Sequence, residues 1–217
     1  RITAKAREEA SAQELLSPVI ENICALLGDA VYGVDIDSLE EGVVKKLSEK
    51  NLTLGFAESC TGGLCAKRIT DIPGSSKVLP GAAVTYANEV KYDLLGVPKK
   101  ILEKYGAVSP ATAVYMAFGA SALFNSDISV GITGIAGPDG GSDEKPIGLC
   151  YIALAVNGTA FVREFRLGGR NRDREYIRTL AASNAFKLVL DAADRINMQA
   201  DFYERRMAES AGEGGCV

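Results

Sequence analysis

The feature that most constrains the fold of this sequence is a pair of alternating runs on either side of Asn157-Gly158. The runs are LCYIALAV and TAFVREFRL. A period of two is typical of a β-strand, and Asn-Gly between two such runs is typical of a type I′ turn. The segment therefore predicts a β-hairpin, so the sheet must contain at least one antiparallel strand pair.

Shorter apolar runs elsewhere in the chain alternate with helical patterns. Residues 52–57, 78–86 and 128–135 are typical of buried strands, and the segments between them have apolar residues at helical spacing. Strands separated by helices predict an α/β domain with helices on both faces of the sheet. We therefore expect a three-layer α/β/α sandwich with a mixed, mostly parallel sheet of about five strands that includes the hairpin.

The domain organisation follows from length and from helix signals. The chain has 217 residues, enough for one main domain and a small appendage. An amphipathic helical pattern ends at Gly28, and Ser38 with Glu41 three residues later is a capping box that begins a second helix. The last residues are small and polar. We expect a helical connector over residues 1–37, a main domain over 38–200 and a disordered tail over 201–217.

Composition excludes several classes of partner. The formal net charge of −4 gives no general attraction to nucleic acid or anionic lipid. No apolar run reaches the ~20 residues that span a bilayer, and the N-terminus lacks the apolar core of a signal peptide. We therefore expect a cytoplasmic protein with neither nucleic-acid nor membrane partners. Its five scattered cysteines are expected to be reduced.

The chain contains no histidine. This excludes a Ser-His-Asp triad, a Cys-His dyad and every metal site that uses histidine, and the cysteines form no CxxC pair for a zinc site. We therefore expect no bound metal. A serine nucleophile in this chain needs another side chain to accept its proton.

The stretch ESCTGG lies where the strand at residues 52–57 runs into a helix. A serine at such a junction is close to a helix N-terminus, whose free N–H groups stabilise an oxyanion or bind a phosphate. Ser59 is therefore a candidate nucleophile, and Cys60 is the second choice because it has no histidine partner. The local sequence supports a structural interpretation about equally well. In that interpretation Ser59 and Thr61 cap the helix, and Gly62 and Gly63 allow close packing.

Charged residues near this stretch supply candidate partners. Glu58 could orient a substrate amide or ribose hydroxyl, although a capping or solvated carboxylate is more frequent. Lysine acts as a base where burial lowers its pKa, and Lys91 in TYANEVK follows a strand end, with Tyr86 and Asn88 beside it. An exposed lysine on an amphipathic helix is the alternative. Lys67 is less able to reach the serine because it lies about two helical turns beyond it.

Two further segments could bind an anion. The loop TGIAGPDGG matches neither GxxxxGK[ST] nor GxGxxG, but its glycines leave backbone N–H groups open; a flexible loop is the alternative. Four arginines gather near the start of the last helix, where a phosphate would meet both guanidinium groups and the helix N-terminus, although solvated arginines would look the same. They are Arg170, Arg172, Arg174 and Arg178.

Taken together, these motifs resemble one family, the CinA C-terminal domain, also called the nicotinamide-nucleotide amidase family. The resemblance covers about residues 38–195, and residues 1–33 look like the connector before this domain in full-length CinA proteins. We therefore expect a fragment without the N-terminal pyrophosphatase domain. Ala87, where serine is common, and the altered start of the last helix depart from the pattern. The matching motifs, in order, are AESCTGGL, TDIPGSS, TYANEVK, LLGV, GAVS, TGIAGPDGG, EKPIG and DREYIR.

The resemblance implies an amidohydrolase that converts the carboxamide of nicotinamide mononucleotide to nicotinate mononucleotide and ammonia. It implies no metal or cofactor, a phosphorylated nucleotide as substrate, and a homo-oligomer. It implies Ser59 as nucleophile, Lys91 as proton acceptor and Tyr86 as support. The residues expected to bind substrate are Glu58, Cys60, Thr61, Gly62, Gly63, Asn88, Thr133, Gly134, Gly137, Arg174 and Arg178.

Two other interpretations stay open. One is a non-catalytic module that binds a nucleotide or a protein, since the CinA name is linked to competence. The intact Ser59, Tyr86 and Lys91 argue against it. The other is an amidase that acts on a different carboxamide; the arginines at the start of the last helix favour a phosphorylated substrate.

Overall fold

The computed structural model describes residues 2–195, so the expected tail at 201–217 lies outside the described residues. The chain divides into two compact units, residues 1–36 and the residues from Asp37 onward. Its elements are α1 (Glu9–Leu27), η1 (Gly28–Ala30), α2 (Leu39–Lys50), β1 (Leu54–Glu58), α3 (Leu64–Thr70), η2 (Ser75–Lys77), β2 (Gly81–Val84), α4 (Asn88–Leu95), α5 (Lys99–Tyr105), α6 (Pro110–Phe124), β3 (Ile128–Gly134), β4 (Leu149–Val156), β5 (Thr159–Arg166) and α7 (Arg174–Arg195).

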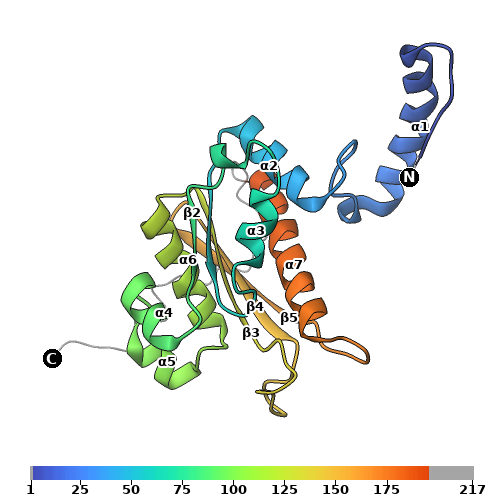
Figure 1. Ribbon diagram of the computed structural model, residues 1–217. Coiled ribbons are helices and arrows are strands. Elements are labelled where there is room, and N and C mark those ends of the chain that lie inside the picture. Colours follow the sequence, from blue (N-terminus) through green and yellow to red (C-terminus); the bar gives the residue numbers. More distant parts are fainter. Residues whose placement is uncertain (1, 196–217) are drawn as a thin grey trace. The chain divides into compact units, whose positions relative to one another are not determined.

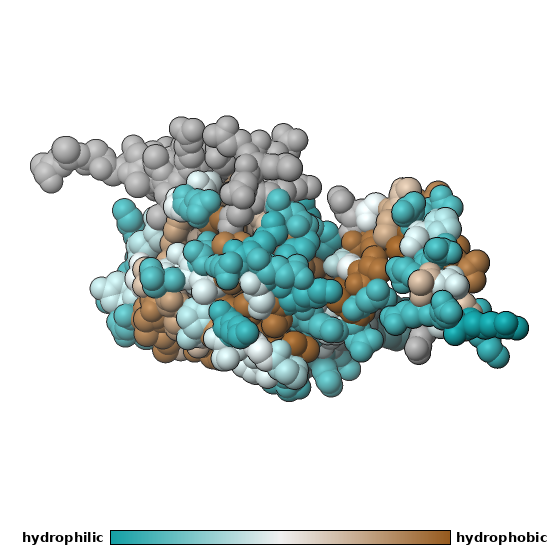
Figure 2. All heavy atoms as spheres, turned by 90° about the horizontal axis from the view of Figure 1, so that it is seen from above, coloured by the Kyte–Doolittle hydropathy of each residue, from teal (hydrophilic) through white to brown (hydrophobic). Residues whose placement is uncertain are grey.

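The N-terminal unit consists mainly of α1, which ends at Gly28 as the sequence predicts but begins only at Glu9. None of the residues of α1 is buried, and Leu15, Leu26 and Leu27 are exposed. Hydrophobic side chains at the surface are visible in Figure 2. No helix within residues 2–195 combines the length and the hydrophobicity that a membrane span requires.

The second unit is built on a mixed five-stranded sheet with the order β2-β1-β3-β4-β5. β1 pairs in parallel with β2 and β3, whereas β4 is antiparallel to both β3 and β5. Four of the five strands therefore run in the same direction, and the predicted mostly parallel sheet is confirmed. The predicted hairpin is β4–β5, with Val156 opposite Thr159 and positive φ angles at Asn157 and Gly158.

Helices cover both faces of this sheet and give the predicted three layers (Figure 1). α2, α3 and α7 pack on one face, where Phe56 of β1 meets Phe186 of α7 edge to face at 6.2 Å. α6 lies on the other face with α4 and α5 beside it. Gly131 of β3 allows close approach there, because a Cβ at this position would lie 2.2 Å from the Ala113 carbonyl oxygen of α6.

The helix caps agree with the sequence signals, but two elements differ. The Ser38 hydroxyl accepts a hydrogen bond from the Glu41 N–H, and the Ser109 hydroxyl caps α6. The strand expected over 78–86 is limited to Gly81–Val84, because Pro80 has no N–H to give to a strand ladder. α5 was not predicted, since its seven residues show no clear apolar period.

The carboxyl ends of three neighbouring strands meet at one edge of the sheet. β1 ends at Glu58, β2 at Val84 and β3 at Gly134. In open α/β sheets ligands bind beyond such ends, where loops and helix N-termini converge. Both glycine-rich segments singled out in the sequence leave the sheet at this edge.

Candidate active site

Ser59 follows the last residue of β1 and is fixed through its backbone. Its N–H donates to the Ile132 carbonyl at 3.0 Å, and its own carbonyl accepts from the Gly62 N–H at 3.1 Å. Gly62 and Gly63 have φ angles of +60° and +89°, which glycine adopts at little cost, and the chain then turns directly into α3. Ser59 thus stands on a tight strand-to-helix turn with only 8% of its surface exposed.

Lys91 reaches Ser59 from the first turn of α4. Its Nζ lies 3.2 Å from Ser59 Oγ and donates to the carbonyl oxygens of Thr85 at 2.8 Å and Tyr86 at 3.0 Å. The lysine is fully buried. The structure therefore brings together the serine and the lysine that the sequence singles out, and the interpretation of Lys91 as an exposed surface lysine is wrong.

The surroundings of Lys91 favour its neutral form. Burial lowers the pKa of its amine from 10.5, and the electrostatic influence of Cys60 and Glu89 opposes this only in part. A neutral amine has two N–H groups, which match the two carbonyl acceptors, Thr85 and Tyr86. Its lone pair is then left toward the Ser59 hydroxyl, which is the geometry that a general base requires.

Glu58 is buried beneath the loop rather than open to solvent. Its carboxylate accepts hydrogen bonds from the N–H groups of Gly63 at 2.9 Å, Cys65 at 3.1 Å and Ala66 at 2.9 Å. These are N–H groups at the start of α3, which lack a partner inside the helix. Glu58 therefore caps α3, which is one of the interpretations that the sequence allows.

The N–H groups of the loop fall into two sets. Those of Gly62 and Gly63 already donate to Ser59 and Glu58. Those of Cys60 and Thr61 donate to no oxygen in the described part of the chain, and they face the Cys60 sulfur. The N–H groups of Cys60 and Thr61 are therefore the pair in this loop that no backbone or carboxylate oxygen within residues 2–195 occupies.

Cys60 contacts a second cysteine that the sequence did not connect with it. A hydrogen bond from the Cys150 thiol lowers the pKa of Cys60, against the opposing effect of burial, and raises the pKa of Cys150. The contact forms because β4, which carries Cys150, pairs with β3 next to β1. Only the strand order reveals this neighbour.

Arg174 joins two of the predicted site segments. Its Nη1 donates to the Gly137 carbonyl at 2.7 Å and its Nη2 to the Tyr86 hydroxyl at 2.8 Å. Tyr86 is 59% exposed, so this contact lies at the surface of the site. Arg178, one helical turn later, instead donates from Nε at 3.2 Å and Nη2 at 2.6 Å to the carbonyl of Thr61.

The second glycine-rich loop is tied to the protein at both ends. The Thr133 hydroxyl is buried and donates to the Ala107 carbonyl at 2.7 Å, and Gly134 follows it as the last residue of β3. Lys145, which no sequence motif marks, donates to the Tyr105 carbonyl at 2.8 Å. These contacts tie both ends of the loop to the end of α5 and the segment that joins it to α6.

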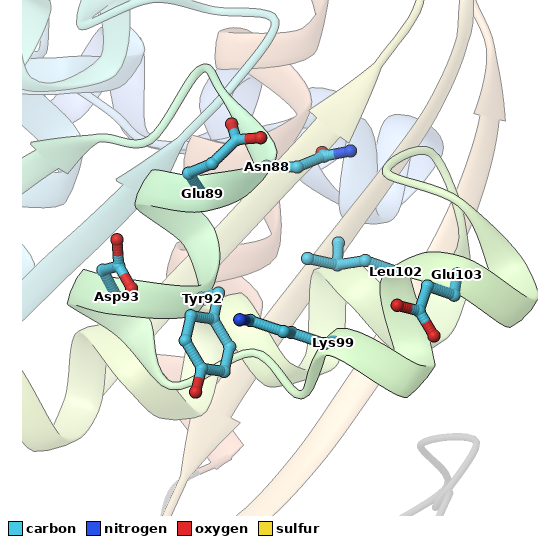
Figure 3. Close-up of a pocket in the computed structure, with 7 residues that line it drawn as sticks. All are labelled: Asn88, Glu89, Tyr92, Asp93, Lys99, Leu102 and Glu103. Atoms are coloured by element: carbon cyan, nitrogen blue, oxygen red, sulfur yellow. The ribbon is translucent and has the colours of Figure 1, made fainter.

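Asn88, another predicted site residue, is the first residue of α4, three residues before Lys91. It lines a pocket of about 460 Å³ between α4 and α5 (Figure 3). Lys99 Nζ lies 4.4 Å from the centre of the Tyr92 ring in this pocket. The remaining lining residues are Glu89, Asp93, Leu102 and Glu103.

The described residues include no group of three or more histidine, cysteine, aspartate or glutamate side chains arranged to hold a metal ion. Lys67 forms an ion pair with Asp71 at 2.6 Å on the exposed face of α3. Its side chain is thus directed away from Ser59, as the sequence predicts.

The fold and the site define a class of protein: a three-layer α/β protein with a buried serine–lysine pair at the carboxyl edge of its sheet. Comparison with known proteins identifies the family to which this fold belongs. The model of the CinA C-terminal domain family matches residues 36–193. The chain belongs to this family.

Individual relatives support the assignment. A CinA-like protein of Desulfovibrio desulfuricans is 48% identical over 189 residues, which are 87% of this chain and 44% of that protein. The crystal structure of the competence/damage inducible protein CihA from Agrobacterium tumefaciens matches with a TM-score of 0.69 and 40% identity, covering 76% of this chain and 98% of that one. A CinA superfamily protein from Klebsiella pneumoniae matches with a TM-score of 0.69 and 29% identity, covering 72% of this chain and 96% of that one. The chain thus spans less than half the length of the curated relative.

Proposed function

We propose that this domain hydrolyses the carboxamide of nicotinamide mononucleotide, giving nicotinate mononucleotide and ammonia. The observation that supports this most directly is the 3.2 Å contact between Lys91 Nζ and Ser59 Oγ, made by a fully buried lysine. A serine becomes a nucleophile when a base accepts its proton, and a desolvated lysine is such a base. The family resemblance points to the nicotinamide carboxamide as the substrate group.

The first step forms an acyl-enzyme. Ser59 Oγ attacks the carboxamide carbon while its proton passes to the Lys91 amine. The carbonyl oxygen becomes an oxyanion, which the N–H groups of Cys60 and Thr61 are available to stabilise. The Lys91 ammonium then gives its proton to the leaving nitrogen, the C–N bond breaks, and ammonia departs.

The second step returns the enzyme to its first state. Lys91, neutral again, accepts a proton from a water molecule that attacks the Ser59 ester. The C–O bond to the serine breaks, Oγ takes back the proton, and the carboxylic acid is released. The carbonyls of Thr85 and Tyr86 hold the lysine through both steps, because they accept from the neutral amine and from the ammonium.

The phosphate of the substrate would lie near the start of α7. Arg174 is exposed there and already joins Gly137 of the glycine-rich loop to Tyr86. Its guanidinium has five N–H donors, so those two contacts leave donors for a phosphate oxygen. A helix N-terminus adds to the attraction of an anion.

The test is ammonia release from the purified chain with nicotinamide mononucleotide, beside free nicotinamide. We expect release from the mononucleotide, a loss of at least about 10³-fold in Ser59→Ala, and a loss of about 10²–10⁴-fold in Lys91→Met. Lys67→Met is the matched control, because this exposed lysine pairs with Asp71 on α3. Full activity in Lys91→Met would refute the lysine base.

No release from folded wild-type protein would refute the amidase proposal. It would favour the alternative of a module that binds a nucleotide or a protein without catalysis. Binding of the mononucleotide by calorimetry would then identify its ligand.

A further inference from the structure

The guanidinium of Arg178 is directed at the loop that carries Ser59. It donates from both Nε and Nη2 to a single acceptor, the Thr61 carbonyl, at 3.2 and 2.6 Å. The same carbonyl accepts from the Leu64 N–H at 3.2 Å. Arg178 itself is half-buried. Two of its N–H donors are therefore bound to the protein itself. Arg178 lies one helical turn after Arg174.

The Thr61 carbonyl belongs to the peptide group that hydrogen-bonds to the backbone of the nucleophile. The peptide bond between Thr61 and Gly62 is planar and trans, so its N–H points opposite to its carbonyl. That N–H belongs to Gly62 and donates to the Ser59 carbonyl at 3.1 Å. Fixing the carbonyl from α7 therefore fixes the N–H that holds the backbone of Ser59.

The loop contains two glycines, so a contact from outside the loop is needed to hold it in one conformation. Gly62 and Gly63 both have positive φ angles, so the turn can adopt many other conformations. A Cβ at Gly62 would lie 3.3 Å from Arg178 Nη2, which shows how closely the guanidinium covers the turn. α7 is long and packs against the sheet, so it offers a rigid support for that contact.

We propose that Arg178 is a positioning residue, which holds the Thr61–Gly62 peptide and thereby orients Ser59 and the N–H groups of Cys60 and Thr61. This role differs from the phosphate binding that the sequence predicts for Arg174 and Arg178. This proposal rests on the amidase function proposed above. A displacement of about 1 Å at a reacting group can reduce the rate about 10²-fold, so the contact has a measurable effect.

The experiment compares Arg178→Ala and Arg178→Lys with the wild type on two substrates, nicotinamide mononucleotide and nicotinamide riboside, which lacks the phosphate. We expect Arg178→Ala to lower kcat about 10²-fold on both substrates and to leave KM nearly unchanged. Arg178→Lys should retain more of kcat, and guanidinium chloride at low concentration should restore part of kcat to Arg178→Ala. Arg163→Ala on the exposed face of β5 is the control and should behave as the wild type.

The opposite pattern would overturn the proposal. A rise in KM confined to the phosphorylated substrate, with kcat retained, would make Arg178 a phosphate ligand. If the wild type hydrolyses neither substrate, the amidase function fails, and the positioning role is read instead from the rate at which a fluorophosphonate labels Ser59. Slower labelling in Arg178→Ala, restored by guanidinium, supports positioning; equal labelling in a folded variant refutes it.

Discussion

Replacing Glu58 by glutamine tests whether the residue before the nucleophile supports the loop or contacts the substrate. The carboxylate is fully buried and accepts three backbone hydrogen bonds, from Gly63, Cys65 and Ala66, at 2.9–3.1 Å. Glutamine has nearly the same shape, so the change creates no cavity. It replaces one of the two acceptor oxygens by an NH₂ donor.

The size of the effect follows from these contacts. At least one N–H then faces another donor, and losing a hydrogen bond to a charged group costs about 1.5–3 kcal/mol. The remaining bonds become neutral and roughly half as strong. Removing a buried charge offsets part of this loss. We expect the free energy of unfolding to fall by about 2–3 kcal/mol, a large part of the 5–15 kcal/mol that is typical of domains.

Urea denaturation followed by circular dichroism measures this difference. Glu49→Gln on the exposed end of α2 is the matched control and should change the free energy of unfolding by less than about 0.5 kcal/mol. An unchanged free energy of unfolding in Glu58→Gln, together with a raised KM, would refute the capping role and make Glu58 a substrate contact.

Three further predictions concern the base, the loop and the core. Because burial lowers the pKa of Lys91 below 10.5, kcat/KM should rise with pH through that lowered pKa and level off before 10.5; a pH-independent kcat/KM over this range would contradict a lysine base. Gly62→Ala introduces a side chain at φ +60° against Arg178, so kcat, measured by ammonia release, should fall; wild-type turnover would argue against the positioning role of Arg178. Gly131→Ala places a Cβ 2.2 Å from the Ala113 carbonyl, so thermal unfolding should show a loss of about 1–3 kcal/mol; unchanged stability would mean that α6 moves freely.

Local signals were sufficient for much of the fold. Asn157-Gly158 predicts the β4–β5 hairpin because both positions need positive φ, and Ser38 predicts a helix start because its hydroxyl accepts from the N–H three residues later. The antiparallel pairing of β3 with β4 was not predictable in this way. It joins residues across the loop 135–148, and no turn motif records it.

The site was predictable in its residue types but not in its contacts. The absence of histidine and the motifs around Ser59 and Lys91 pointed to a serine–lysine pair. The partners of Lys91 are backbone carbonyls, which every residue has, so no side chain marks them in the sequence. The place of Arg178 near the start of the last helix, together with the family resemblance, predicts phosphate binding, whereas its contact with Thr61 depends on how α7 packs beside α3.

The serine and the lysine depend on each other through the geometry of the sheet. Ser59 leaves β1, and Lys91 belongs to the helix after β2, its parallel neighbour. The two carbonyls that hold Lys91 lie between β2 and α4, so the segment that carries the base also orients it. A shift of α4 would break those hydrogen bonds and the contact with Ser59 together, leaving a buried amine without partners, which is costly. The energy that keeps the lysine buried therefore also keeps it aligned with the serine.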